Sequence, residues 1–184
     1  MAIDRTTRFA FVELHARATH RVAGDFLRHL IEAVPNRVHT MLTDNGTHFT
    51  TPGNVASAAS LIKEAIVAGE TFRAHSFELA CARNDVEHRP TKPRHPWTNG
   101  QVERTNRTIK EAIVRRYHYD DHEQQGAHLA DFIAAYNYGR RLKALRGLTP
   151  FEASAKSGLP IQTASGSTRS IKCRDQTSSE WTSG

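Results

Sequence analysis

Two segments of the sequence place acidic residues at points where the chain is expected to turn. The first covers residues 43–49 and reads Thr-Asp-Asn-Gly-Thr-His-Phe, and the second is a basic, proline-rich stretch over residues 92–107. Asp44 comes just past the end of an expected strand, and Glu103 falls in the first turn of an expected helix. Because α/β proteins usually place their sites in loops at strand ends, both acids are candidate functional residues.

The chemistry of these two acids has an ordinary interpretation and a functional one. An aspartate before Asn-Gly is a common turn former, and a glutamate in a first helical turn favours the helix dipole. Taken together, carboxylates that converge from separate elements form a hard-oxygen site suited to Mg²⁺ or Mn²⁺. Two such ions about 3.5–4 Å apart can clamp the attacking and leaving oxygens of a phosphodiester displacement. Asp44 and Glu103 are therefore candidate metal-binding residues, and the turn and helix-dipole roles remain the alternatives.

Basic residues on and before the second helix predict a DNA-binding surface. Arg104, Arg107 and Lys110 give this helix a basic face, for which the alternatives are a solvated surface or contact with phosphates. Arg94 and His95 precede the helix and are expected to extend the same surface. His95 is expected to contact DNA or to orient the loop, and it is not interpreted as catalytic.

Composition limits the classes of protein to which this chain can belong. The 184 residues carry 25 Lys plus Arg against 19 Asp plus Glu, a net charge of +6, and 38% of them are hydrophobic. These values favour one domain with one core and exclude a collagen, a coiled coil and a fully disordered chain. No apolar run approaches the roughly 20 residues of a membrane span, and there is no signal-peptide pattern. Two cysteines and eleven histidines form no disulfide framework or zinc motif, so we expect a cytoplasmic protein with no membrane partner.

Local patterns predict the elements that must position these residues. Thr19 is expected to cap a helix, and the sequence Thr149-Pro150-Phe151-Glu152 is a capping box for another that ends at Gly158. The remaining expectations are strands over 8–14, 37–43 and 85–89 and helices over 20–33, 54–68, 75–84, 99–117 and 123–138. Residues 50–72 are interpreted as an insertion. Residues 161–184 are rich in Ser and Thr without periodicity, which predicts a disordered or divergent tail.

The motifs together resemble the catalytic core of the retroviral-integrase superfamily, in particular bacterial insertion-sequence transposases with a DDE triad. The resemblance covers residues 1 to about 160. The matching residues are Ile3-Asp4-Arg5-Thr6-Thr7-Arg8, Thr43-Asp44-Asn45-Gly46, residues 87–96, Thr98-Asn99-Gly100-Gln101-Val102-Glu103-Arg104 and Leu148-Thr149-Pro150-Phe151-Glu152.

This resemblance implies an α/β, ribonuclease-H-like fold in which a mixed sheet is flanked by helices. It makes Asp44 the second catalytic carboxylate and Glu103 the third, with Mg²⁺ or Mn²⁺ as cofactor. The implied activity is metal-dependent DNA strand transfer in transposition or integration. The implied partners are DNA and either a second copy or a full-length transposase, in the bacterial cytoplasm and on the nucleoid.

The chain departs from this family at its first strand. In the family, the first catalytic aspartate lies on a central strand upstream of the hairpin, whereas Asp4 matches a later acid that is not a metal ligand. We therefore expect residues 1–160 to be a partial core whose first strand is missing or incomplete and which is inactive alone. Losing a central strand leaves N–H and C=O groups of both neighbours without partners. The alternatives are a non-catalytic fragment that binds DNA or a transposase, and the product of a decayed element.

Overall fold

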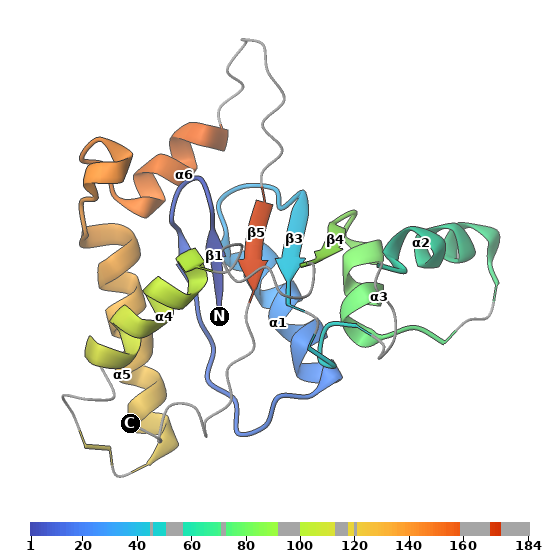
Figure 1. Ribbon diagram of the computed structural model, residues 1–184, viewed down its shortest axis with the longest axis horizontal. Helices are drawn as coiled ribbons and strands as arrows, with labels where there is room; N and C mark the ends of the chain where they lie inside the picture. Colours follow the sequence, from blue (N-terminus) through green and yellow to red (C-terminus); the bar gives the residue numbers. More distant parts are fainter. Residues whose placement is uncertain are drawn as a thin grey trace.

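The computed structural model describes residues 1–44, 46–50, 57–70, 73–91, 100–112, 118–119, 121–158 and 170–173. Figure 1 shows a central sheet with helices around it. The elements are β1 (Ala2–Asp4), β2 (Ala10–Phe11), α1 (His20–Ala33), β3 (Thr40–Thr43), α2 (Ala59–Ala68), α3 (Ser76–Arg83), β4 (Glu87–Pro90), α4 (Gly100–Ala112), α5 (His122–Ala134), the π-helix η2 (Ala135–Gly139), the 3₁₀-helix η3 (Lys143–Leu145), α6 (Pro150–Gly158) and β5 (Ser170–Cys173).

The sheet is mixed and has the strand order β2-β1-β5-β3-β4. Strand β1 is antiparallel to β2 and to β5, whereas β3 is parallel to β5 and to β4. The sequence predicts no regular structure after residue 161, and the structure differs from that prediction at Ser170–Cys173. These four residues form a strand because they pair with neighbours on both sides, which no local sequence pattern reveals. The rest of the predicted tail lies outside the described residues.

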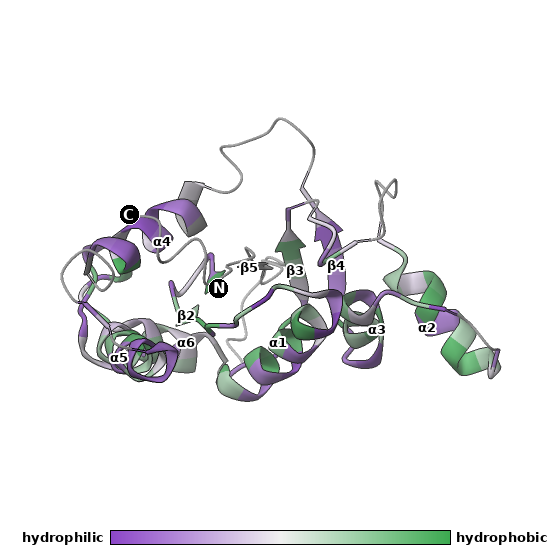
Figure 2. Cartoon of the chain, turned by 90° about the horizontal axis from the view of Figure 1, so that it is seen from below, coloured by the Kyte–Doolittle hydropathy of each residue, from purple (hydrophilic) through white to green (hydrophobic). Residues whose placement is uncertain are grey.

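Neighbouring residues of β1 and β2 face opposite sides of the sheet. Met1 and Ala10 pack with Ile109 of α4 and with Leu129 and Ile133 of α5. The other side is the larger cluster, which joins Ala2 and Phe9 to side chains of α1, α3 and β3. Figure 2 shows the same division, with α1 and α3 on one side of the strands and α4 on the other. Helices on both faces are what the sequence analysis predicts for this fold.

Helix α1 begins and ends where its sequence predicts. The hydroxyl of Thr19 accepts a hydrogen bond from the backbone N–H of Val22 at 3.3 Å, which makes Thr19 the N-cap. The residues that face the core are Ala23, Gly24, Phe26, Leu27 and Leu30. Gly24 allows a close crossing with α3, because a Cβ atom there would lie 3.0 Å from the carbonyl oxygen of Ser76.

Strand β2 is shorter than the strand predicted over 8–14. Arg8 has a φ of 64°, a left-handed conformation that places it in the hairpin turn rather than in a strand. The buried side-chain amide of Asn137 forms two hydrogen bonds with Ala10 of β2. Its Oδ1 accepts from the N–H of Ala10 at 2.9 Å, and its Nδ2 donates to the carbonyl of Ala10 at 2.7 Å. Asn137 lies in η2, where the predicted helix 123–138 changes to π geometry. A side chain therefore pairs with the outer edge of β2.

The other predicted boundaries differ by a few residues. Strand β4 begins at Glu87 rather than at 85, because Asp85 has a φ of 55° and belongs to the preceding turn. Helix α2 begins at Ala59 and lies at the margin of the molecule beyond α3, within the segment interpreted as an insertion (Figure 1). Of the helix predicted over 99–117, the structure describes Gly100–Ala112, and residues 113–117 lie outside the described part. No described helix has the length and apolar character needed to span a membrane.

The predicted capping box of α6 is confirmed. The N–H of Thr149 donates to Oε2 of Glu152 at 2.9 Å, and the N–H of Glu152 donates to the hydroxyl of Thr149 at 3.2 Å. The hydrogen bond from the Thr149 backbone holds the pKa of Glu152 below its usual value. Two N–H groups of the first turn are thereby satisfied, and the helix ends at Gly158 as predicted.

Candidate metal and nucleic-acid site

Asp44 follows β3 and is half-buried. Its Oδ1 accepts a hydrogen bond from the backbone N–H of Gly46 at 3.0 Å. A Cβ atom at position 46 would lie 3.0 Å from the same oxygen, closer than most such contacts allow. Glycine therefore lets the loop fold back on the carboxylate. Asn45 lies outside the described residues.

The loop after Asp44 is fixed at its far end. The N–H of Phe49 donates to the carbonyl of Gly46 at 2.9 Å, and the ring of Phe49 packs edge-on against Phe77 at a centroid distance of 5.0 Å. His75 joins this loop to α3, because its Nε2 donates to the carbonyl of Thr47 at 3.0 Å while its Nδ1 accepts from the N–H of Phe77 at 3.4 Å. This arrangement requires a neutral ring, and burial lowers the pKa of His75 accordingly.

A buried polar chain supports the strand end that carries Asp44. The hydroxyl of Thr43 lies 2.8 Å from Nε2 of His88, and Nδ1 of His88 lies 3.7 Å from Oε1 of Glu78. The same Glu78 oxygen accepts from the N–H of Ala58 at 3.0 Å. Thr43, Glu78 and His88 are each no more than 3% exposed. These contacts join β3, β4, α3 and the residue before α2.

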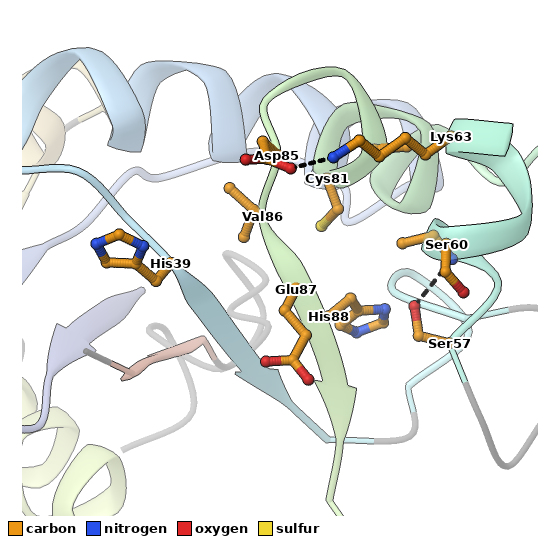
Figure 3. A pocket seen from close by; sticks show the side chains of 11 residues that line it. His39, Ser57, Ser60, Lys63, Cys81, Asp85, Val86, Glu87 and His88 are labelled. Carbon is orange, nitrogen blue, oxygen red and sulfur yellow. Dashed lines mark hydrogen bonds and ion pairs between the residues drawn. The ribbon is translucent and has the colours of Figure 1, made fainter. Parts of the chain in front are cut away.

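Thr43, His88 and Glu78 follow the hydroxyl–imidazole–carboxylate order of a hydrolase triad, but these side chains are not accessible to a substrate. The hydroxyl of Thr43 is buried, so it cannot meet a substrate in the way that a nucleophilic hydroxyl must. Figure 3 shows Glu87 and His88 pointing to opposite sides of β4, with His88 on the side of Ser57. No pattern in the sequence pairs Glu78 with His88. The one available signal was a glutamate among apolar residues in the short helix 76–83.

The pocket drawn in Figure 3 lies between β4, α2 and α3, away from the candidate site. Asp85 at its margin pairs with both Lys63 and Arg37. The lining of this pocket includes His39 and Glu87, which lie at the start of the parallel strands β3 and β4. Asp44, in contrast, follows the carboxyl ends of these strands. Ligands of open α/β sheets bind at the carboxyl ends of strands, so this pocket is not the expected site.

Glu103 lies in the first turn of α4 and is exposed. Asn106 and Ile109 of the same helix are buried, and Ile109 packs in the cluster with Leu129 and Ile133. Arg104 and Arg107 are exposed. Lys110 is half-buried on the same helix, and Arg94 and His95 lie outside the described residues.

The two candidate carboxylates come from different parts of the sheet. Asp44 follows β3, whereas Glu103 lies on a helix that contacts β1, and β5 separates these two strands. Within the described part of the chain, no group of three or more His, Cys, Asp or Glu side chains forms a metal site. The chemistry of the two carboxylates fits Mg²⁺ or Mn²⁺, which prefer oxygen ligands. The described residues supply only this partial ligand set.

Asp4 has a structural role at the hairpin. It is 1% exposed, and its two oxygens accept hydrogen bonds from the N–H of Thr6 at 2.9 Å and the hydroxyl of Thr7 at 2.7 Å. Across β5, Asp4 aligns with Met41, three residues before Asp44. Three residues along a strand and two strand spacings across correspond to about 14 Å between the Cα atoms of Asp4 and Asp44. The two acids are therefore too far apart to share an ion.

Part of the chain matches a known family model. Residues 84–150 match the family model described as an integrase core domain. Over these residues the chain is similar to an integrase core domain. The match includes His88, all of α4 with Glu103, and α5, whereas Asp44 precedes it. A search of curated proteins found no match.

The solved structures extend the integrase likeness to the fold. The crystal structure of the catalytic core domain of BIV integrase superimposes with a TM-score of 0.52 and 23% identity, covering 77% of this chain and 74% of that one. The predicted class, an α/β ribonuclease-H-like fold, is thereby confirmed.

Proposed function

We propose that this chain is the catalytic-core part of a transposase or integrase that binds DNA along α4. The observation that carries the proposal is the integrase-core match over residues 84–150, which contains Glu103 and the exposed residues Arg104 and Arg107. Helical periodicity places Arg104 and Arg107 across the helix from the buried residue Ile109. Lys110, with Arg94 and His95 before the helix, completes the proposed DNA-binding set.

In this proposal Asp44 and Glu103 hold the divalent ion. Bound Mg²⁺ or Mn²⁺ would supply Lewis-acid stabilisation to the phosphodiester that a DNA 3′-OH attacks. The protein's own contribution is positioning. The N–H of Gly46 fixes one oxygen of Asp44, and α4 presents Glu103 beside cationic side chains that contact phosphates.

The salt dependence of DNA binding tests this proposal. Each phosphate contact contributes about 0.9 to the slope of log K against log salt. We expect Arg104→Ala, Arg107→Ala and Lys110→Ala each to reduce that slope by about one. Arg21→Ala is the matched control, because Arg21 is also an exposed helical arginine but lies on α1, across the sheet. Equal slopes for wild type and the three α4 variants would contradict the proposal.

A second candidate function is a non-catalytic fragment that binds DNA or a full-length transposase. The incomplete ligand set of the described residues favours it. It shares the DNA-binding surface and differs in chemistry, so a strand-transfer assay distinguishes the two. A decayed element product would show neither binding nor activity. We propose that the protein partner is a second copy or a full-length transposase. The proposed place of action is nucleoid DNA in the bacterial cytoplasm. Light scattering with and without DNA measures the assembly.

A further inference from the structure

Strand β5 lies between two strands that do not pair with each other. Its residues pair with Ala2–Asp4 of β1 on one side and with Thr40–Thr43 of β3 on the other. Strands β1 and β3 run in opposite directions, so an occupant of this position must be parallel to β3 and antiparallel to β1. The gap between β1 and β3 is therefore selective for the direction of the strand that it accepts.

Both walls of this gap are buried. Ala2, Ile3, Thr40 and Met41 are each no more than 1% exposed. Without an occupant, the N–H and C=O groups that β1 and β3 direct at β5 would lose their partners. A buried backbone group that loses its hydrogen-bond partner destabilises the fold. The gap is thus a strand-binding groove of the kind that proteins use for peptide recognition by strand addition.

We propose that residues 170–173 complement the sheet in cis, as a separable strand that the groove binds. The occupant comes from the far end of the chain, and eleven residues separate it from Gly158 at the end of α6. An extended segment of that length spans about 36–40 Å. This exceeds twice the radius of gyration of about 16 Å expected for a domain of this size, so the chain's own tail reaches the groove.

The sequence of the occupant is that of a weak strand. Ser170-Ile171-Lys172-Cys173 contains one β-branched apolar residue, and its neighbours in the sequence are polar. Pairing with two walls rather than strand propensity holds it in place, which makes it exchangeable. Cys173 aligns with Thr43, the residue before Asp44. The segment in the groove therefore determines which residue lies beside the candidate site, a property separate from the proposed DNA binding.

A disulfide across the β1–β5 pair tests the docking in the full-length chain. Ala2 and Cys173 are directly opposite in the register, and opposed residues of antiparallel strands have Cα separations within the range that disulfides accept. We expect Ala2→Cys to form an intramolecular disulfide with the native Cys173 under mild oxidation. The control Ala2→Cys with Cys173→Ser retains Cys81 and forms none. A disulfide-linked dimer, or no disulfide at all, would overturn complementation in cis.

A proline substitution tests whether the sheet depends on this strand. Ile171→Pro removes an N–H from a strand that is paired on both sides, whereas Ser178→Pro changes the tail beyond the strand. We expect Ile171→Pro to lower the melting temperature and to speed hydrogen exchange of β1 and β3, with Ser178→Pro unchanged. A synthetic peptide of residues 168–176 should reverse both effects in proportion to its concentration. Wild-type exchange in Ile171→Pro would overturn the proposal, and the disulfide test stands should that variant fail to fold.

Discussion

The hydroxyl of Thr43 lies 2.8 Å from Nε2 of His88, and this buried contact joins the strand that leads into Asp44 to the adjacent strand β4. Glu78 faces the other ring nitrogen from α3. The loop that presents Asp44 is thus supported from within by three polar side chains, in addition to the packing of Phe49 on Phe77.

The first prediction concerns the pH dependence that Glu78 confers. Burial by itself raises the pKa of Glu78, but the His88 ring and the N–H of Ala58 outweigh it, so the pKa lies below the usual value. A lowered pKa stabilises the fold above the ordinary glutamate value of about 4.3, and that stability is lost as pH falls through the lowered pKa. We expect the stability difference between wild type and Glu78→Gln to be constant above about pH 5 and to shrink towards about pH 3.

Urea unfolding of both proteins at several pH values between about 7 and 3 measures this difference. Parallel loss of stability in wild type and in Glu78→Gln would show that Glu78 does not make the interaction described.

The second prediction concerns Asn137 and the edge of β2. Asn137→Leu leaves the N–H and carbonyl of Ala10 without their present partners, and each orphaned buried group costs about 1–3 kcal/mol. We expect a loss of about 2 kcal/mol or more in the free energy of unfolding. Glu123→Gln, on the exposed side of α5, is the control and should change it by less than about 0.5 kcal/mol. A loss no larger in Asn137→Leu than in the control would refute the role of this amide.

The third prediction concerns Gly46. Gly46→Ala places a Cβ atom 3.0 Å from Oδ1 of Asp44, so the carboxylate must move. Moving a ligand's supporting contact typically costs on the order of tenfold in metal affinity. We expect weaker Mn²⁺ binding with the fold retained, measured by electron paramagnetic resonance of free Mn²⁺. Gly126→Ala on α5 has open space at its Cβ and should leave Mn²⁺ binding unchanged. Equal Mn²⁺ affinity in the two variants would show that Gly46 does not support metal binding by Asp44.

The fourth prediction concerns activity. Two-metal chemistry needs a ligand shared by both ions, and Asp4 is held in the hairpin about 14 Å from Asp44. We expect this chain, assayed alone with Mg²⁺ or Mn²⁺ on a labelled DNA end, to give no strand transfer. Losing even one well-placed stabilising group typically costs about 10²–10³ in rate. Activity that disappears in Asp4→Asn would make Asp4 a ligand and contradict the structural role given to it.

Local chemistry predicts the parts of the fold that local interactions determine. The cap at Thr19 and the box of Thr149 and Glu152 each involve residues at most three apart, and both helix starts are confirmed. The apolar stripe of α1 likewise follows from its period. Asp44 and Glu103 could be selected as site residues because a turn and a first helical turn are also local features.

The parts that the sequence does not reveal depend on contacts between distant residues. The pair of Asn137 and Ala10 spans 127 residues, and the pair of Thr43 and His88 spans 45. Strand β5 exists through pairing with β1 and β3, so a polar segment without periodicity becomes the middle of the sheet. Strand propensity is dominated by such context, which explains why the tail is predicted to be disordered.

The most direct test of the proposed site is whether Asp44 and Glu103 bind the same ion. Titration of isotope-labelled protein with Mn²⁺ broadens the amide signals nearest the bound metal. We predict that the signals of Gly46 and Arg104 broaden together over one range of Mn²⁺ concentration, and that both Asp44→Asn and Glu103→Gln suppress the broadening at both positions. Glu111→Gln, an exposed carboxylate farther along α4, is the control and should leave it unchanged. Broadening at Arg104 that persists in Asp44→Asn, or at Gly46 in Glu103→Gln, would contradict a shared metal site.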